Sequence, residues 1–284
     1  MNDALGDRMK EYESQFAGVR FLPLLPVVAR LDGKNFSTFT RGLRRPYDER
    51  LTNLMIDTTA SLVEETNAVC GYTQSDEITL AWYSSSADSQ IYFDGRVQKM
   101  VSVLAATCTA HFNAKLAQVL PEKTGKLPVF DCRVWQLPTL TEAANVFVWR
   151  ELDATKNAIT MAAQEFYSHT ELHEKNGAEK QEMLFAKGVN FNDYPAYFKR
   201  GSYIQRRKVT GKFTAEDLEA LPPKHHARTN PDLVVERTEY RRLDLPPILK
   251  VTNRVGVIFH SEEPIINTGD NVCDTASKSE PGAT

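Results

Sequence analysis

The order of strand and helix signals in the first half of the chain limits its fold more than any other feature of the sequence. Apolar, β-prone runs alternate there with helical periodicity, the runs at residues 24–31, 68–73, 78–82 and 129–137 and the helical segments at residues 46–62 and 98–116. The two middle runs are joined by a short turn, which predicts a hairpin. The order β, α, β, β, α, β is the split βαβ or ferredoxin-like order. We therefore expect an α+β fold in which an antiparallel sheet carries helices on one face.

The second half of the chain has a different pattern. Thr139, followed three residues later by a glutamate, forms a capping box that predicts the start of a helix. The pattern is then mostly helical as far as Lys187, with a break expected at residues 151–153. Two further β-prone runs lie at residues 203–209 and 233–240. This part is therefore expected to be a mostly helical C-terminal extension with some strand.

These patterns divide the chain into three parts. We expect a sheet domain at residues 1–138, a helical and mixed C-terminal part at residues 139–266, and a disordered tail at residues 267–284. The tail consists largely of Gly, Ser, Thr, Asn and Asp and has little apolar surface to bury.

Charge, cysteine content and hydropathy exclude several classes of protein. The 34 Lys and Arg against 37 Asp and Glu give a net charge of −3, so a nucleic-acid-binding surface must be a local patch. The four cysteines, at positions 70, 108, 132 and 273, form no Cys-x-x-Cys pair, which argues against a zinc site or a disulfide framework. No apolar export segment or membrane span is evident. We expect a cytoplasmic protein with reduced thiols and no membrane partner.

Two acidic turns lie where the predicted fold brings them together. Asp32-Gly33 ends the first strand, and Asp76-Glu77 lies at the tip of the hairpin. Because the first strand is central and next to the hairpin, Asp32 and Asp76 are expected at one end of the sheet. Paired carboxylates of this kind hold two Mg²⁺ ions in two-metal catalysis. Each sequence is also an ordinary turn sequence, which is the alternative interpretation when each is taken alone.

Six motifs in the chain have the order and approximate spacing found in one enzyme family. They are Arg30-Leu31-Asp32-Gly33-Lys34-Asn35-Phe36, Gln74-Ser75-Asp76-Glu77, Phe130-Asp131-Cys132-Arg133-Val134, Trp149-Arg150 with Asp153 and Asn157, Glu182-Met183-Leu184-Phe185, and Lys199-Arg200-Gly201. With them the chain resembles the tRNA-histidine guanylyltransferase family over residues 5–260. It is most similar to the bacterial branch, whose guanylyltransferase-like enzymes add nucleotides in the 3′-to-5′ direction.

The resemblance implies a polymerase-palm catalytic domain that works in the reverse direction. In the family, ATP or GTP activates the 5′-monophosphate of a tRNA, and the 3′-hydroxyl of an incoming nucleoside triphosphate then attacks the activated end. Carried over by motif, Asp32 and Asp76 ligate two Mg²⁺ ions, the Gly33 carbonyl completes one metal shell and Glu77 supports the site. Phosphoryl transfer requires mainly positioning and charge neutralisation, so this set is chemically sufficient.

The same resemblance implies the nucleotide-binding residues and the partners. The amides of Lys34, Asn35 and Phe36 would hold a triphosphate, while Ser75 and Lys99 would contact phosphate. The implied partners are tRNA together with GTP, ATP and other nucleoside triphosphates. Family members resemble dimers of dimers, so a homotetramer is expected.

A basic segment predicts where RNA binds. Residues 199–212 carry six Lys and Arg and no acidic residue, with Tyr203 inside the segment and Tyr197 and Phe198 just before it, a composition suited to a phosphate backbone. A solvated strand and loop is the alternative interpretation. A weaker basic cluster contains Arg41, Arg44, Arg45 and Arg50. The expected tRNA- or phosphate-binding residues are Lys199, Arg200, Arg206, Arg207 and Lys208, with Arg133, Arg150 and Asn157 added from the family motifs.

One departure from the family pattern bears on substrate choice. Where the eukaryotic enzymes have His-Ile-Asn-Asn, this chain has Thr155-Lys156-Asn157-Ala158, which keeps a single asparagine. Two groups that would read unpaired anticodon bases are therefore replaced. We expect template-dependent repair of tRNA 5′ ends. The alternatives are a dedicated tRNA-histidine guanylyltransferase that adds the extra 5′ guanosine, a nucleotidyl cyclase of the same palm architecture, and a non-catalytic RNA-binding protein.

Overall fold

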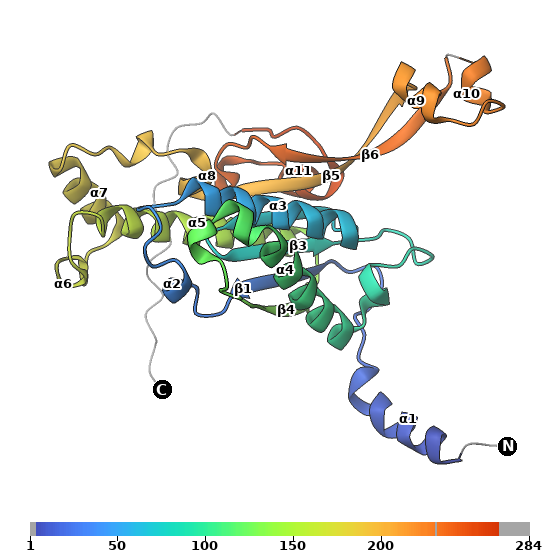
Figure 1. Cartoon of the computed structure of the whole chain (residues 1–284), viewed down its shortest axis with the longest axis horizontal. Coiled ribbons are helices and arrows are strands. Elements are labelled where there is room, and N and C mark those ends of the chain that lie inside the picture. Colours follow the sequence, from blue (N-terminus) through green and yellow to red (C-terminus); the bar gives the residue numbers. More distant parts are fainter. Residues whose placement is uncertain (1–3, 231, 267–284) are drawn as a thin grey trace, which may run out of the picture.

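A six-stranded antiparallel sheet forms the centre of the computed structural model, which describes residues 4–230 and 232–266 (Figure 1). The strands are β1 (Val27–Gly33), β2 (Cys70–Gln74), β3 (Glu77–Trp82), β4 (Phe130–Gln136), β5 (Ser202–Lys212) and β6 (Val234–Leu243). Their order across the sheet is β4-β1-β3-β2-β5-β6. The first four strands have the order 4-1-3-2 of a ferredoxin-like sheet, so this prediction is confirmed.

Two long helices pack on one face of the sheet. They are α3 (Glu49–Thr66) and α4 (Val97–Val119). Alternation along β1 directs Val27 and Leu31 toward them, and both side chains are fully buried. The Asp48 carboxylate caps α3 by accepting a hydrogen bond from the second helical amide at 3.0 Å. The helix therefore starts after this cap and not at Pro46, where the sequence pattern placed it.

Helices also cover the opposite face of the sheet. The expectation that all helices lie on one face is therefore correct for α3 and α4 but not for the whole fold. The covering helices are α5 (Leu140–Ala163) and α11 (Arg254–His260). Helix α5 runs unbroken through residues 151–153, where we expected a break. The reason is that Glu151 points into the protein, where its carboxylate accepts hydrogen bonds from the Tyr203 hydroxyl at 2.9 Å and the Ile248 amide at 2.8 Å.

The C-terminal part contributes to the same sheet. Strand β5 pairs with β2, with Thr73 opposite Ser202, and β6 extends the sheet by one more strand. Shorter helices on this side are α6 (His169–Leu172), α7 (Gly177–Ala186) and α8 (Ala196–Arg200). The predicted boundary at residue 138 therefore lies inside one continuous sheet, and as a division between folding units it stays a prediction.

Two segments extend away from the body of the molecule (Figure 1). Strands β5 and β6 continue beyond the sheet as a two-stranded arm, with α9 (Ala215–Ala220) and α10 (His226–Thr229) at its far end. Helix α1 (Ala4–Ala17), which the sequence pattern did not predict, extends from another corner. The arm explains why two β-prone runs occur in a part of the chain that is otherwise helical.

Three expectations concern the chain as a whole. The tail expected to be disordered, residues 267–284, lies outside the described residues. Cys70, Cys108 and Cys132 are free and buried. Among the described helices, none combines the length and the apolar character that crossing a membrane requires.

Candidate active site

The fold brings the acidic residues of β1 and of the β2–β3 turn together at one end of the sheet. Asp32 lies opposite Glu77 in the β1–β3 register, and the Gly33 amide donates a hydrogen bond to the Asp76 carbonyl at 3.2 Å. Ser75 has a φ of 56° in the turn, and its hydroxyl donates to the Asp76 carboxylate at 3.0 Å. The juxtaposition of Asp32 with Asp76 that the topology predicted is confirmed.

The two carboxylates form an electrostatically unfavourable pair. Burial and the nearby Asp32 raise the pKa of Asp76, because both disfavour its charged form. Among the described residues, no group of three or more His, Cys, Asp or Glu side chains is placed to hold a metal ion. Carboxylate oxygens are nevertheless the donors that Mg²⁺ prefers, and it normally keeps waters and substrate phosphates as its other ligands. The donor set therefore fits Mg²⁺ held together with a phosphate-bearing substrate.

Glu77 is held by two arginines. Its carboxylate accepts hydrogen bonds from Nε and Nη2 of Arg150 at 2.6 and 2.7 Å, and Nε of Arg30 lies 3.8 Å away. Burial raises the pKa of Glu77, and the Arg150 guanidinium opposes that effect. Arg150 also donates to Asp153 at 2.9 Å and is only 10% exposed. Nε and Nη2 of Arg150 are thus engaged in positioning Glu77 and Asp153, and its expected role as a tRNA or phosphate contact stays a prediction.

The backbone segment after β1 is partly occupied by contacts within the protein. A Cβ atom on Gly33 would come within 2.3 Å of the Phe36 ring, so the aromatic ring occupies the space over this glycine. The Lys34 amide, expected to bind a triphosphate, donates to the Val129 carbonyl at 2.9 Å. Asn35 adopts a left-handed conformation with φ of 54°. The Asn35 and Phe36 amides have no hydrogen-bond partner within the described part of the chain, so they remain available.

A cavity of about 560 Å³ opens beside Asp76. It lies between α2 (Phe36–Phe39), the start of α3, the β2–β3 turn and α8. Its walls include Phe36, Tyr47 and Phe198, and Arg44 and Arg45 lie at its edge. Apolar walls with a few polar groups are typical of small-molecule sites, and arginines favour phosphate oxygens. The sequence signalled this cavity only as a weak basic cluster, because the contribution of α8 comes from a remote segment.

Lys99 does not lie at this site. Its helix α4 begins beside the segment that precedes β1, where the Val97 amide donates to the Val19 carbonyl at 3.0 Å. The α4 residue that contacts Phe36 is Phe112, with ring centroids 5.7 Å apart. At 1.5 Å per helical residue, Lys99 is about 20 Å from this contact along the axis. The prediction that Lys99 contacts phosphate is therefore wrong for this conformation, in which its ammonium lies over the Phe93 ring.

The basic segment is paired with acidic groups that the linear sequence does not place beside it. Lys208 contacts Glu236 on β6 at 2.7 Å, and Arg207 contacts Glu263 at 3.2 Å. Arg206 donates to the Asn67 side chain at 3.3 Å. The Lys208–Glu236 pair is exposed, and exposed pairs contribute little energy, so phosphate can still replace Glu236, whereas the Arg207 side chain is only 13% exposed. The segment therefore remains a candidate RNA surface, but not the unpaired basic strip that we expected.

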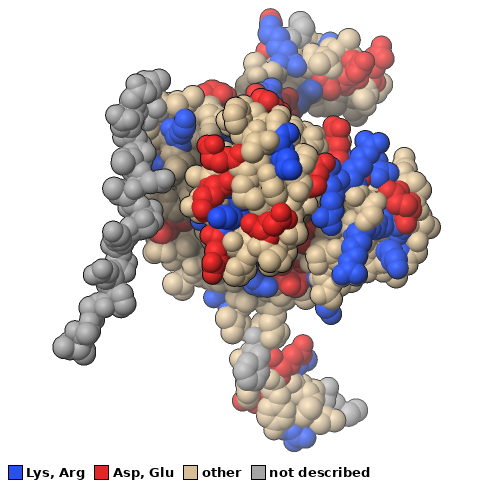
Figure 2. Space-filling model, turned by 90° about the vertical axis from the view of Figure 1, so that its left-hand side faces the viewer, with Lys and Arg blue, Asp and Glu red and all other residues tan. Residues whose placement is uncertain are grey.

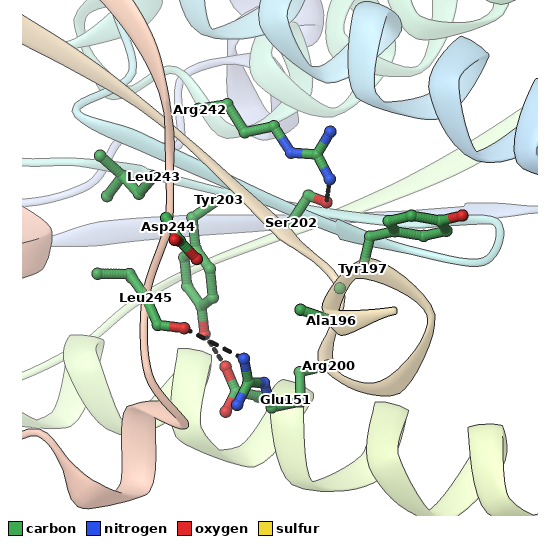
Figure 3. A pocket seen from close by; sticks show the side chains of 11 residues that line it. Glu151, Ala196, Tyr197, Arg200, Ser202, Tyr203, Arg242, Leu243, Asp244 and Leu245 are labelled. Carbon is green, nitrogen blue, oxygen red and sulfur yellow. Dashed lines mark hydrogen bonds between the residues drawn. The ribbon is translucent and has the colours of Figure 1, made fainter. Parts of the chain in front are cut away.

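Lys199 and Arg200 lie at a second, smaller cavity or next to it. This cavity measures about 310 Å³ and lies between α8, β5 and β6 (Figure 3). Arg200 donates to the Leu245 carbonyl at 3.2 Å, and Arg242, which sequence reasoning missed, donates to the Ser202 hydroxyl at 3.0 Å. The Lys199 ammonium donates to a backbone carbonyl, that of Asn192. Tyr197 lines both cavities, so they are adjacent.

The remaining predicted RNA contacts are exposed. Arg133 on β4 contacts Asp131 at 3.6 Å, and Asn157 lies on the exposed side of α5. Figure 2 shows Lys and Arg side chains gathered on one side of the visible face, beside a group of Asp and Glu side chains. The net charge of −3 thus conceals local basic patches, as a nucleic-acid-binding surface requires.

Comparison with known proteins identifies relatives along most of the chain. The family model described as "Thg1: tRNAHis guanylyltransferase" matches residues 6–138. The tRNA(His) guanylyltransferase of Schizosaccharomyces pombe is 29% identical over 222 residues, which cover 73% of this chain and 84% of the relative. An uncharacterized protein, R259, of Acanthamoeba polyphaga mimivirus is 28% identical over 233 residues, covering 74% of this chain and 79% of that protein.

Two solved structures have the same fold. A bacterial tRNA(His) guanylyltransferase (Thg1)-like protein in complex with ATP is 37% identical, with a TM-score of 0.67, and the match covers 72% of this chain and 87% of that chain. A bacterial Thg1-like protein in complex with GTP is 31% identical, with a TM-score of 0.68, covering 89% of this chain and 99% of that chain. The expected family and palm-like fold are thereby confirmed. The chain belongs to the tRNA(His) guanylyltransferase (Thg1) family of nucleotidyltransferases.

Proposed function

We propose that this enzyme restores missing nucleotides at tRNA 5′ ends in the 3′-to-5′ direction, after ATP or GTP has activated the 5′-phosphate. Each incoming nucleoside triphosphate is selected by pairing with the opposite strand of the acceptor stem. The proposal rests on which side chains are exposed in the α5 segment at residues 155–158, where eukaryotic members have the His-Ile-Asn-Asn pattern.

Two of the four residues in this segment are unable to read a base. The Thr155 hydroxyl is within hydrogen-bond distance, 3.0 Å, of the Glu151 and Lys199 carbonyls, and Ala158 is fully buried. Recognition of unpaired bases needs exposed hydrogen-bond donors and acceptors. In this segment only Lys156 and Asn157 have exposed side chains. Each lost pair removes about 1–3 kcal/mol of discrimination, so little preference for one anticodon remains. Base pairing with the template strand is then the main source of selectivity.

The residues at the end of the sheet suit phosphoryl transfer. Asp32 and Asp76 would hold two Mg²⁺ ions, with the Gly33 carbonyl as a further ligand, and the ions supply charge neutralisation for the attacking and leaving oxygens. Glu77, fixed by Arg150, supports these carboxylates. The triphosphate of the incoming nucleotide lies in the larger cavity, against Arg44 and Arg45.

The other predicted contacts complete the proposal. The Asn35 and Phe36 amides and the Ser75 hydroxyl bind phosphate oxygens, while Arg133, Asn157 and the basic segment contact tRNA. The assembly is a homotetramer, as the family resemblance implies. Asn35, Ser75, Arg133 and Asn157 are exposed in the described structure. Lys208 is paired with Glu236 only by a surface contact.

The test compares substrates that differ in anticodon and in template base. Purified enzyme is incubated with Mg²⁺, each labelled nucleoside triphosphate, and either tRNA-histidine or a 5′-truncated tRNA of another specificity, each with cytosine or adenine opposite the vacant position. We expect incorporation into both tRNAs, with the added base complementary to the template. Strong preference for tRNA-histidine, with guanosine added opposite either base, would instead show the dedicated enzyme. Release of a cyclic nucleotide without RNA would indicate the cyclase alternative.

A further inference from the structure

The sheet face beneath α5 is left open along its β4 side. Strand alternation and the β1–β4 register place Arg30 beside Arg133, and Asp32 beside Asp131, on this face. Arg133 and Asp131 are exposed, whereas the β3 side of the same face is closed by the bond between Arg150 and Glu77. Trp149, on the first half of α5, borders this strip. We call Arg30, Asp32, Asp131, Arg133 and Trp149 the open shelf.

Trp149 is unusual for an aromatic residue on a packed helix. It is 49% exposed, whereas Phe147, two residues earlier, is fully buried. The guanidinium of Arg150 lies 4.5 Å from the centre of its ring, and that of Arg30 lies 5.6 Å away. The ring is therefore fixed from the protein side, and about half of its surface remains free. An oriented aromatic ring with neighbouring arginines is the arrangement on which unpaired bases stack in RNA-binding proteins.

The charge of Arg30 is only weakly paired. Its Nε is buried and has no hydrogen-bond partner in the described part of the chain, and Glu77 is 3.8 Å away. Two residues along β1, on the same face, lies Asp32, at a spacing of about 7 Å. A phosphate at Arg30 would therefore lie next to the carboxylate that the proposed function assigns to the metals. Arg133, opposite Arg30 in the register, adds a second cation there.

The open shelf and the larger cavity are separate. The cavity is lined by Met161 and Gln164, at the other end of α5, and these lie 12 or more residues beyond Trp149, or about 18 Å along the helix. The larger cavity is lined by Asp76 and the open shelf contains Asp32, so each site borders one member of the carboxylate pair. A reaction between a nucleoside triphosphate and an RNA end needs two such sites.

We propose that Trp149 stacks on the 5′-terminal base of the tRNA and that Arg30, with Arg133, binds the 5′-phosphate of the same nucleotide. This inference rests on the proposed function, because it names the place of the RNA end in that reaction. Stacking is tolerant of base identity, since every base presents a π face. The open shelf therefore orders the end of the RNA and leaves the choice of nucleotide to the template.

A fluorescent RNA tests the stacking directly. The probe is a 5′-phosphorylated tRNA with 2-aminopurine as its 5′-terminal base, whose emission falls when the base stacks on an aromatic ring. We expect quenching by the parent enzyme, less by Trp149→Phe and none by Trp149→Ala. Leu152→Ala is the matched control, since Leu152 is on the same helix, 41% exposed, and outside the open shelf. Equal quenching by Trp149→Ala and parent would overturn the inference.

Kinetics distinguish stacking from a merely structural role. Trp149→Ala should raise the KM for truncated tRNA about tenfold, the order expected for the loss of one base–aromatic stack, with the KM for nucleoside triphosphate unchanged. A rise in both constants would overturn the inference, because it would indicate a disturbed site. If the parent extends no truncated tRNA, the proposed function fails, while the fluorescence measurement still tests the stacking by binding alone.

The phosphate contact is tested with the same RNA carrying either a 5′-phosphate or a 5′-hydroxyl. The parent should bind the phosphorylated RNA more tightly, and Arg30→Gln should reduce this ratio. Arg133→Gln, at an exposed position, serves as a second variant in which folding is not at risk. Trp149→Ala should keep the ratio, because it removes the stack and not the cation. An unchanged ratio in both arginine variants would overturn the assignment of the phosphate.

Discussion

Replacing Arg150 by Met tests the most tightly bonded contact of the candidate active site. The substitution removes the hydrogen bonds to Glu77 at 2.6 and 2.7 Å but keeps an unbranched apolar side chain on α5. Glu77 would then be a poorly solvated carboxylate near Asp32, with Arg30 at 3.8 Å as its remaining cation. The structure therefore predicts lower stability together with a displaced Glu77.

The magnitude follows from the burial of the pair. Removing one partner of a buried ion pair costs about 3–5 kcal/mol, because the other charge is left uncompensated. Glu77 keeps 15% exposure and the nearby Arg30, so we expect the lower end of this range, about 3 kcal/mol of unfolding free energy. Without Arg150, the pKa of Glu77 should rise further, since burial already raises it. The loss should therefore diminish as the pH falls and Glu77 becomes protonated.

The assay is urea denaturation at pH 7 without Mg²⁺, with the parent, Arg150→Met, Glu77→Gln and the double variant. The double variant also removes the carboxylate that Arg150→Met leaves without its main partner, so it should recover about 2 kcal/mol relative to Arg150→Met. Lys156→Met, at an exposed position on the same helix, is the control and should change stability little. The reasoning is refuted if Arg150→Met loses less than about 0.5 kcal/mol, or if the double variant is no more stable than it.

Three further outcomes are expected. Asp76→Asn should abolish most nucleotide incorporation, yet raise the urea midpoint measured without metal, because burial and a like charge give this carboxylate a raised pKa. Arg206→Ala with Lys208→Ala should flatten the plot of log Kd for tRNA against log salt by about two units, while Glu236→Gln should tighten binding by freeing a lysine. Burial raises the pKa of Glu151 above its ordinary 4.5, so its contribution to stability is present below pH 4.5 and is lost as the pH rises through the raised pKa. Glu151→Gln should remove that decline in pH-dependent urea midpoints.

Local patterns predicted the elements of the sheet with little error. The apolar run at 24–31 predicted β1, and the two runs around the turn at Asp76 predicted the β2–β3 hairpin. Periodicity depends on neighbours within one or two turns of chain, so it is visible without the fold. The start of a helix depends on a single capping group. The pattern at Thr139 marked the cap of α5, whereas the helix pattern from Pro46 did not mark the Asp48 cap of α3.

The features that sequence reasoning missed depend on distant residues. Arg150 meets a glutamate 73 positions away, and Lys208 meets one 28 positions away, so neither pairing is readable from the sequence around them. Lys99 occupies the wrong end of a 23-residue helix, a displacement that motif alignment does not reveal. The break expected in α5 failed because Glu151 is buried and bonded to Tyr203 and Ile248.

By itself, the sequence determined the order of strands and helices, the convergence of Asp32 with Asp76, and the family. These follow from local periodicity and from motifs that are contiguous in the chain. Only the tertiary structure decided which charged groups are free to bind a substrate. A cation that lies near a carboxylate in space is paired with it whatever its sequence neighbours are, as the bond between Arg150 and Glu77 shows. Arg30, whose Nε makes no hydrogen bond in the described part of the chain and lies 3.8 Å from Glu77, is paired less tightly. The physical reason is that electrostatic pairing depends on distance in space and on burial, which folding sets between segments far apart in the chain.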